Sequence, residues 1–325
     1  MSGTETVADD VTNIDYETDY EAGQDNVNTF GLEMHNPVFF VSAILIIAFV
    51  LLSLMFPHIS KTGLEATKAW TLQYFDWFFV IATNFVLFFC LAIAISPLGK
   101  IRLGGTDAKA EFGMASWIAM LFSAGVGIGM LFYGAAEPMA YYTDWGGTPL
   151  NVEALTPAAE RLALGATVFH WGLTPWAVYA VIGLALAFFS FNKGLPLTIR
   201  SAFYPILGDR IWGWPGHLID ILAVIATLFG LATSLGFGAQ QAATGISFLF
   251  GVEASLTSQL LLIVFISGLA IISVLRGMDG GIKLLSNINM VLAALLLAFV
   301  YVAGPTMQIF KGFGTAVASY VEYAI

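Results

Sequence analysis

The sequence predicts an all-α integral membrane protein, and its composition and long apolar runs are the first two observations that indicate this class. Apolar residues make up 58% of the 325-residue chain, charged residues only 10%, and the mean hydropathy is +0.83. A membrane-spanning helix needs roughly 20 mostly apolar residues, and runs of that length recur along the chain. A soluble domain has no use for so much apolar surface, so the chain is best counted in membrane spans.

Seven membrane spans are predicted between an acidic tail and an amphipathic end. The tail, residues 1–36, holds nine of the 22 acidic residues and is predicted to be disordered and cytoplasmic. Residues 37–112 hold two spans, residues 113–303 hold five, and residues 304–325 form an amphipathic linker helix at the membrane interface. The predicted spans lie near residues 37–56, 73–97, 113–140, 162–190, 218–249, 255–275 and 282–303.

The distribution of basic residues predicts the orientation, because cytoplasmic loops of membrane proteins carry an excess of Lys and Arg. The connections after the second, fourth and sixth spans hold eight of the 12 basic residues. The protein is therefore expected in the cell (inner) membrane, where these three spans end on the cytoplasmic side. The N-terminus is also expected to be cytoplasmic. Lys61 and Lys68, which follow the first span, argue weakly for the opposite orientation.

The third span contains Gly125, Gly127 and Gly129 within five residues. Each glycine in a helix interior costs about 1 kcal/mol relative to alanine. The GxxxG spacing of Gly125 and Gly129 suits close helix packing, but Gly127 lies on the other side of a helix. Unwound backbone is tolerated in a membrane only where it lines a cavity or is buried in protein, and transporters bind substrates and ions at such breaks. The stretch therefore predicts a broken helix whose main chain binds a small molecule or an ion.

The fourth span carries three aromatic residues, Trp171, Trp176 and Tyr179, around Pro175. On a continuous helix these aromatic side chains fall within an arc of roughly 140°, and Pro175 is expected to kink the helix. An interfacial aromatic belt would lie at the ends of the span, whereas these residues begin well inside it. Aromatic faces recognise quaternary ammonium groups through cation–π contacts. The cluster therefore predicts one wall of a quaternary-ammonium site, which a second helix must complete.

These motifs resemble those of the betaine/choline/carnitine transporter family. The resemblance covers roughly residues 37–325, and its matching segments are AGVGIGMLFYGAAEP, FHWGLTPWAVYAVIGLALAFFSFNKGLPLTIRSAFYPILGDRIWGWPGH, IDILAVIATLFGLATSLGFG and GIKLLSNINM. The family implies a secondary active carrier with a broken-helix inverted-repeat fold, in which two extra helices precede two five-helix repeats. Residues 113–303 then correspond to the first repeat. The second repeat is missing, so the chain is expected to be the N-terminal part of a transporter.

The resemblance implies that the glycines and the three aromatic residues described above bind the substrate. Family members that carry choline commonly have an acidic residue at the position of Gly129. A betaine carries its own carboxylate, which an acid at that position would repel. The sequence therefore favours a zwitterionic quaternary-ammonium or sulfonium osmolyte, such as glycine betaine, over choline.

The resemblance also raises sodium as the coupling ion, and no cofactor is expected. One sodium site would use the main chain at Ser123 and Val126. Another would use two threonines four residues apart in the fifth span, where this sequence has Thr227 and then Leu231. Leucine lacks the oxygen ligand that a sodium site needs, so the resemblance leaves the sodium stoichiometry open.

The seventh span bears on sodium dependence in the same family. In sodium-independent exchangers an arginine replaces a sodium ion at the position that matches Met290, which follows Asn289 here. The absence of a basic residue in the body of this span favours sodium coupling, and we group Asn289 and Met290 with the candidate sodium residues. A sodium-independent betaine/carnitine-type exchanger and a non-transporting membrane sensor or assembly subunit are the alternatives.

An enzyme is not expected, because the sequence holds no nucleophile–His–acid set, metal-ligand cluster or phosphate-binding loop. His170 and Glu137 are assigned no chemistry. Asp220, in the fifth span, is expected to be structurally paired in preference to lining an ion path. The expected partners are a small zwitterionic substrate, sodium, the lipid bilayer and identical subunits of a homotrimer, with no nucleic acid.

Overall fold

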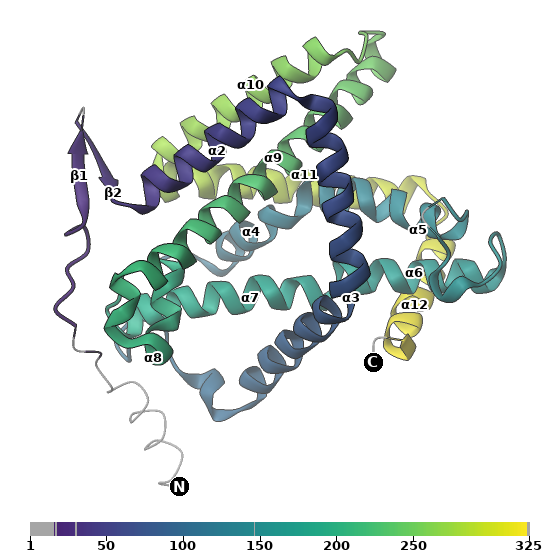
Figure 1. Cartoon of the computed structure of the whole chain (residues 1–325). Coiled ribbons are helices and arrows are strands. Elements are labelled where there is room, and N and C mark those ends of the chain that lie inside the picture. Colours follow the sequence, from purple (N-terminus) through teal and green to yellow (C-terminus); the bar gives the residue numbers. More distant parts are fainter. Residues whose placement is uncertain (1–15, 17, 30, 146, 324–325) are drawn as a thin grey trace, which may run out of the picture. The chain divides into compact units, whose positions relative to one another are not determined.

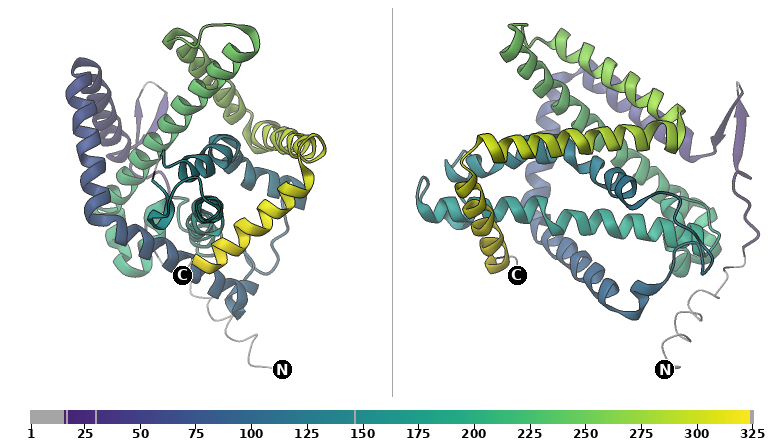
Figure 2. Two further views of the ribbon diagram at one scale, coloured as in Figure 1. Left: turned by 90° about the vertical axis from the view of Figure 1, so that its right-hand side faces the viewer. Right: turned by 180° about the vertical axis from the view of Figure 1, so that it is seen from behind.

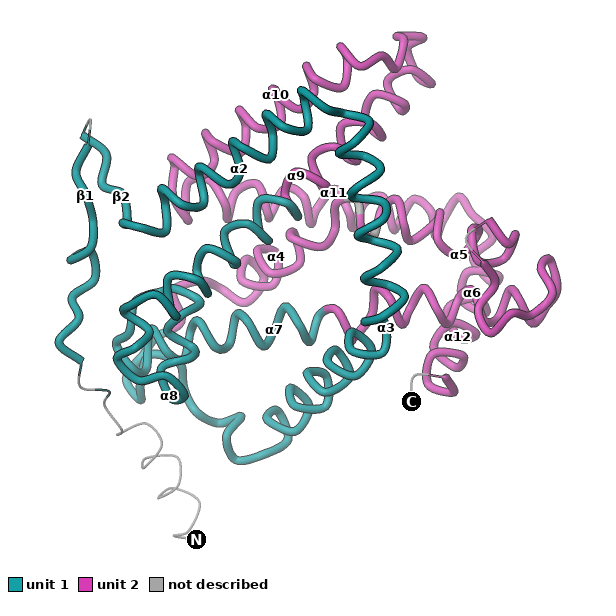
Figure 3. Tube along the Cα trace, in the orientation of Figure 1, with its two compact units in different colours: residues 1–109, 176–230 teal, residues 110–175, 231–325 magenta. Residues whose placement is uncertain are grey.

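A computed structural model describes residues 16, 18–29, 31–145 and 147–323, and Figure 1 labels its helices and strands along the chain. The chain divides into two compact units, coloured separately in Figure 3. Unit 1 comprises residues 1–109 and 176–230, and unit 2 comprises residues 110–175 and 231–325. Two of the helices, α7 and α9, continue from one unit into the other.

Unit 1 begins with a β-hairpin that is followed by two long apolar helices. Its elements are β1 (Asn26–Thr29), β2 (Leu32–His35), α2 (Val38–Met55), α3 (Pro57–Ile95), most of α7 (Leu173–Ala187), α8 (Tyr204–Leu207) and the first part of α9 (Trp214–Phe250). Short 3₁₀ or π-helical turns lie at Pro97–Lys100, Phe188–Asn192, Ile199–Phe203 and Gly208–Trp212.

Unit 2 contains the broken third span and the C-terminal helices. Its elements are α4 (Met114–Gly125), a π-helical segment (Val126–Tyr133), α5 (Gly134–Tyr142), a 3₁₀ turn (Pro149–Asn151), α6 (Pro157–Trp171), the start of α7, the second part of α9, α10 (Leu256–Leu275), a second π-helical segment (Met278–Ile282), α11 (Lys283–Ala303) and α12 (Thr306–Tyr323). Within this unit α11 packs along α4, and α12, yellow in Figure 2, packs against α6.

Small residues permit the close approach of α12 to α6. A Cβ atom added to Gly165 of α6 would overlap with the side chain of Ser319 in α12. The rings of Phe169 and Tyr320 pack nearby with centroids 6.4 Å apart, and Arg161 and Glu322 form an ion pair across the two helices. The predicted amphipathic segment is therefore a helix that is held to α6 by packing, an aromatic contact and a charge pair.

Six helical stretches in the described part of the chain are long and apolar enough to cross a membrane, with α6 and α7 counted together as Pro157–Asn192, so this is a multi-pass membrane protein. At most 11% of the apolar stretch of any of these helices is buried within the protein, as expected for helices that face lipid. The third predicted span is not among these six, in keeping with the broken helix expected there. There α4, a π-helical segment and α5 replace one long helix, because glycine interrupts it.

The connection between the first two predicted spans is helical. Helix α3 begins at Pro57 and runs without interruption to Ile95, so Lys61 and Lys68 lie on a helix and not in a loop. Proline is favoured at the first helical position, where its missing N–H would be unpaired in any case. Lys61 also pairs with Glu65 one turn later, at 3.9 Å, which supports this polar first section.

The tail that was expected to be disordered contains ordered structure in its described part, residues 16, 18–29 and 31–36. Strands β1 and β2 form an antiparallel hairpin in which Asn26 pairs with His35. Tyr20 stacks on Trp212, with ring centroids 3.9 Å apart and planes 2° from parallel. The prediction was based on the acidic composition of the whole tail, which does not identify the hairpin or the Tyr20 stack. Residues 1–15 lie outside the described residues.

Arg200 is the centre of a buried polar cluster in unit 1. Its side chain is 2% exposed, and its Nε atom lies 2.5 Å from Oδ2 of Asp220. The Arg200 backbone N–H donates to Oδ1 of the same carboxylate at 3.1 Å, and its Nη2 donates to Nε2 of His35 at 2.7 Å. Asp220 is therefore structurally paired, as the sequence analysis favoured, and the same arginine contacts the end of the hairpin.

Candidate functional site

The glycine stretch of the third span breaks its helix, as predicted from the sequence. Helix α4 ends at Gly125, and a π-helical segment leads to α5. Inside that segment Gly127 has φ −62° and ψ −121°, a ψ value far from helical geometry. The break is therefore centred on Gly127, the glycine that does not belong to the GxxxG pair. That this main chain binds a ligand remains a prediction.

The indole of Trp171, the last residue of α6, lies directly against Gly129. A Cβ atom added to Gly129 would stand 2.6 Å from Cζ3 of Trp171 and 3.2 Å from its Cε3. Real Cβ atoms do not approach ring carbons this closely, so any side chain at Gly129 would displace the indole. The ring of Tyr133 stacks on Trp171 with centroids 5.6 Å apart and planes 19° from parallel. Two predicted site residues, Gly129 and Trp171, are thus in contact within unit 2.

A buried carboxylate, Glu137 of α5, contacts the same indole. The Nε1–H of Trp171 donates to Oε2 of Glu137. Oε1 of Glu137 accepts from the Tyr141 hydroxyl at 2.8 Å and lies 2.6 Å from Nδ1 of His170. The Glu137 side chain is only 7% exposed, and burial of a carboxylate is unfavourable unless such hydrogen bonds stabilise it. The arrangement connects the helix after the break to the end of α6.

The other predicted aromatic residues, Trp176 and Tyr179, lie in α7 within unit 1. Their rings meet edge to face, with centroids 5.8 Å apart and planes 89° from parallel, and the Tyr179 side chain is 45% exposed. Helix α6 ends before them, at Trp171, and the next residue, Gly172, has φ −87° and ψ −134°. The expected arc of three aromatic residues assumed one continuous helix, so it does not extend to Trp171.

The break between α6 and α7 agrees with the interruption expected from Pro175, and the structure places it three residues earlier, at Gly172. In a continuous helix the proline ring would clash with the carbonyl four residues before it, which belongs to Trp171. Pro175 is instead accommodated in the first turn of α7, where the missing N–H leaves no helical bond unmade.

The candidate sodium residues of unit 2 lie around the contact between α4 and α11. The Ser123 hydroxyl lies 3.0 Å from the Ser286 hydroxyl of α11, and it also donates to the Met120 carbonyl at 3.0 Å. Asn289 and Met290 follow Ser286 by three and four residues, so they share its side of α11. The structure therefore places Ser123 beside the helix that carries Asn289 and Met290.

Two further candidate sodium residues differ in their surroundings. Val126, the first residue of the π-helical segment, is 4% exposed. Thr227 belongs to α9 within unit 1, where its exposed hydroxyl donates to the Ala223 carbonyl at 2.8 Å. That hydrogen bond is the usual one of a threonine in a helix, so the role of Thr227 in sodium binding remains a prediction.

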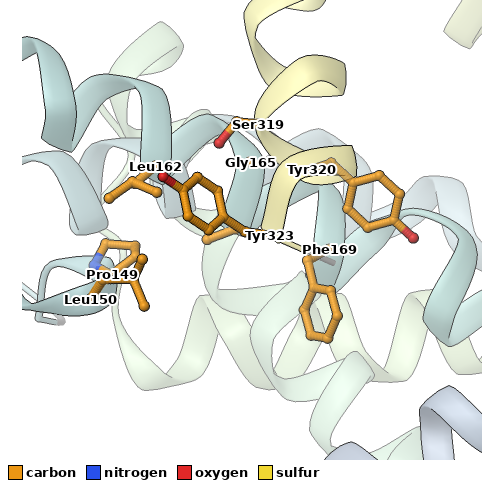
Figure 4. Close-up of a pocket in the computed structure, with 9 residues that line it drawn as sticks. Pro149, Leu150, Leu162, Gly165, Phe169, Ser319, Tyr320 and Tyr323 are labelled. Atoms are coloured by element: carbon orange, nitrogen blue, oxygen red, sulfur yellow. The ribbon is translucent and has the colours of Figure 1, made fainter. Parts of the chain in front are cut away.

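A separate apolar pocket of about 370 Å³ lies between α6, the turn at Pro149–Asn151 and α12. Figure 4 shows the rings of Phe169, Tyr320 and Tyr323 at this pocket, with Ser319 beside Gly165. It contains none of the predicted site residues, and we assign it no ligand.

A model of the betaine/carnitine/choline family of transporters matches residues 37–325 of this chain. The chain belongs to this family. It is not an enzyme, since the family and the relatives below are transporters. It spans about two fifths to three fifths of the length of the curated relatives described next.

Three of those relatives show the range of substrates that their names describe. A glycine betaine transporter of Vibrio parahaemolyticus is 57% identical over 95% of this chain and 59% of its own length. The glycine betaine transporter OpuD of Bacillus subtilis is 44% identical over 88% of this chain and 55% of its own. A high-affinity choline transport protein of Escherichia coli is 42% identical over 88% of this chain and 42% of its own.

For this member of the betaine/carnitine/choline transporter family, sequence reasoning missed Glu137, His170 and Ser286 as neighbours of the candidate site. A signal for Glu137 was present, because Gly129, Tyr133 and Glu137 recur every four residues and an acidic residue near a membrane span is a functional candidate by default. Ser286 carried no comparable signal. Its proximity to Ser123 depends on a contact between helices that lie far apart in the sequence.

Proposed function

We propose that a protein containing this chain is a sodium-coupled transporter of a zwitterionic osmolyte such as glycine betaine, working by alternating access in the cell (inner) membrane with a cytoplasmic N-terminus. One observation carries the proposal: the Trp171 indole lies against Gly129, beside a helix break centred on Gly127. An aromatic ring and unwound main chain together suit the two ends of a betaine. Family membership supports transport, and the names of the relatives support this class of substrate.

The chemistry of a betaine explains how such a site would work. Its quaternary ammonium group has no hydrogen-bond donor, so it binds through cation–π contact with an aromatic face such as that of Trp171. Its carboxylate needs hydrogen-bond donors, and the backbone N–H groups freed at a helix break supply them. No acidic side chain stands at Gly129 to repel that carboxylate. Trp176 and Tyr179, in α7, stay candidate substrate-binding residues on the family resemblance alone.

Sodium binding is proposed at the end of α4 and the adjoining side of α11. The hydroxyls of Ser123 and Ser286 lie 3.0 Å apart, and sodium is a hard cation that binds oxygen ligands. Main-chain carbonyls near Val126 and the side-chain amide of Asn289 would add oxygen atoms, with Thr227 as the candidate of unit 1. Bound sodium would stabilise the broken helix and thereby favour substrate binding.

Uptake by the intact protein in proteoliposomes tests this function. Labelled glycine betaine is supplied with an inward sodium gradient, with N-methylglucamine in place of sodium, and with unlabelled choline as competitor. Sodium-dependent uptake that choline inhibits only weakly supports the proposal. Equal uptake without sodium supports the exchanger alternative. Binding without flux supports a sensor or assembly subunit. Stronger inhibition by choline than by unlabelled betaine contradicts the proposed preference for a zwitterionic substrate. Cross-linking in the bilayer tests the homotrimer that the family resemblance implies.

A further inference from the structure

We propose that Glu137 is a positioning residue of the substrate site, whose buried carboxylate fixes the orientation of the Trp171 indole. This inference rests on the proposed function, because it assigns importance to Glu137 through an aromatic face that would meet the substrate. Neither the family resemblance nor the names of the relatives assign it this role. It follows from the arrangement of donors around one carboxylate.

The three donors around Glu137 divide between its two oxygen atoms. Oε1 receives the hydroxyl of Tyr141, one turn further along the same helix, and lies 2.6 Å from Nδ1 of His170. A carboxylate oxygen accepts hydrogen bonds, so in the tautomer that pairs with Oε1 the proton lies on Nδ1 of His170. With Oε1 held from two sides, Oε2 is directed at the indole of Trp171, whose Nε1–H is its donor. The carboxylate is thereby fixed before any substrate arrives.

The indole of Trp171 is in turn held at three places along one side of the broken helix. Its N–H meets Glu137, its six-membered ring lies against Gly129, and Tyr133 stacks on it. These three residues follow one another at four-residue intervals, which places them on one side of a helix. Rotation of the indole would break the hydrogen bond to Glu137 and move the ring away from Gly129.

Ring orientation matters for a quaternary ammonium ligand. Cation–π attraction requires the cation to lie over the ring face, within about 6 Å of the centroid. A ring free to turn would present its face for only part of the time, and the substrate would then pay the entropy of fixing it. Loss of the Glu137 carboxylate should therefore weaken betaine binding without any direct contact between Glu137 and the substrate.

A double-mutant cycle on the intact protein tests the proposal. Betaine dissociation constants are measured for Glu137→Gln, Trp171→Phe and the double variant, with Glu322→Gln as the control. The Glu322→Gln substitution also removes a carboxylate, but from the ion pair with Arg161 elsewhere in unit 2. We expect about a tenfold rise in each single variant, the size typical of a lost charge-assisted hydrogen bond, no further rise in the double variant, and no change in the control. Fully additive effects would overturn the proposal, because Glu137 would then act independently of Trp171.

A spectroscopic measurement separates positioning from a general structural role. The protein is labelled with 7-fluorotryptophan, which leaves the Cζ3 edge against Gly129 unsubstituted, and the Trp171 resonance is assigned by its loss in Trp171→Phe. Glu137→Gln should shift and broaden that resonance, and Glu322→Gln should not. If Glu137→Gln does not fold, exchange of the Trp171 indole N–H in the wild-type protein decides instead. Slow exchange supports the hydrogen bond, and exchange as fast as that of Trp145, which is 83% exposed, contradicts it.

The cycle also separates failure of this inference from failure of the proposed function. If Trp171→Phe and Trp171→Leu both leave betaine binding unchanged, the substrate site itself has been assigned wrongly. If the Trp171 variants weaken binding and Glu137→Gln does not, the site stands and the positioning role of Glu137 is refuted.

Discussion

The indole ring of Trp171 occupies the space that a side chain at Gly129 would need. An added Cβ atom would stand 2.6 Å from Cζ3 of the ring, closer than real structures allow. This contact gives Gly129 a second role beside the break at Gly127, since the missing side chain lets α6 end against the broken helix. Gly129, predicted from the sequence to bind the substrate, is thus also a packing partner of the candidate aromatic wall.

The first prediction is that Gly129→Ala weakens betaine binding at least about tenfold, because the methyl group displaces the Trp171 ring; overpacking of this kind typically costs about 1–3 kcal/mol. Gly134→Ala is the matched control, since a Cβ at Gly134 meets no atom within 4 Å. We expect the control to bind betaine normally and to melt at the same or a higher temperature. Equal effects of the two substitutions on the dissociation constant would show that Gly129 has no special contact.

The second prediction concerns the choice between betaine and choline. Gly129→Asp should raise the ratio of choline to betaine uptake, because its carboxylate balances the charge of choline and repels that of betaine. The substitution also displaces Trp171, so both rates are expected to fall. Gly129→Ala is the comparison, since it displaces the ring without adding charge. If the ratio of choline to betaine uptake is the same in Gly129→Asp and Gly129→Ala, charge does not explain why this chain has no acidic residue at position 129.

The third prediction concerns the buried ion pair of unit 1. Arg200→Met leaves the Asp220 carboxylate buried without its charge partner, and we expect a loss of about 3–5 kcal/mol in the free energy of unfolding. Replacing both residues, as in Arg200→Met with Asp220→Leu, should recover much of this loss. Lys61→Met removes an exposed pair with Glu65 and should change stability by less than about 1 kcal/mol. Melting in detergent measures all three, and similar melting temperatures for Arg200→Met and Lys61→Met would contradict the assignment.

The fourth prediction concerns the docking of α12 on α6. Gly165→Val should push α12 away, because a Cβ there already overlaps with the Ser319 side chain. In a Cys90→Ser background, a cysteine at the buried position Ala316 should resist maleimide and become reactive when Gly165→Val is added. Gly183→Val is the control, since a Cβ at Gly183 meets no atom within 4 Å. Continued protection of the cysteine in Gly165→Val would show that α12 docks by other contacts.

The long apolar helices could be predicted from the sequence because hydropathy identifies a span without knowledge of its neighbours. Helices α2, α10 and α11 begin and end within a few residues of the predicted spans. The polar start of α3 was missed, since low hydropathy between two spans looks like a loop although Pro57 allows a helix to begin there. The hairpin of β1 and β2 was missed because the composition of the whole acidic tail outweighed a ten-residue pattern.

The candidate site could be predicted only in part, for a physical reason. The spacing of the glycines predicts a local break in the helix, and the structure places that break at Gly127. Contacts between distant segments leave no such local pattern: Glu137 and Trp171 are 34 residues apart, and Ser123 and Ser286 are 163 apart. At Gly172 the sequence analysis missed a local break. It assumed a continuous helix there and therefore placed three aromatic residues on one arc.

The role of Trp171 in substrate binding is tested most directly by calorimetry. The affinity of the intact protein for glycine betaine is measured in sodium buffer for the wild type and for Trp171→Leu. The leucine keeps an apolar side chain at the end of α6 and removes both the aromatic face and the donor to Glu137. We expect the wild type to bind betaine and the variant to have a dissociation constant at least about tenfold higher, as for a lost cation–π contact. The same dissociation constant in both proteins would contradict the assignment of Trp171 to the substrate site.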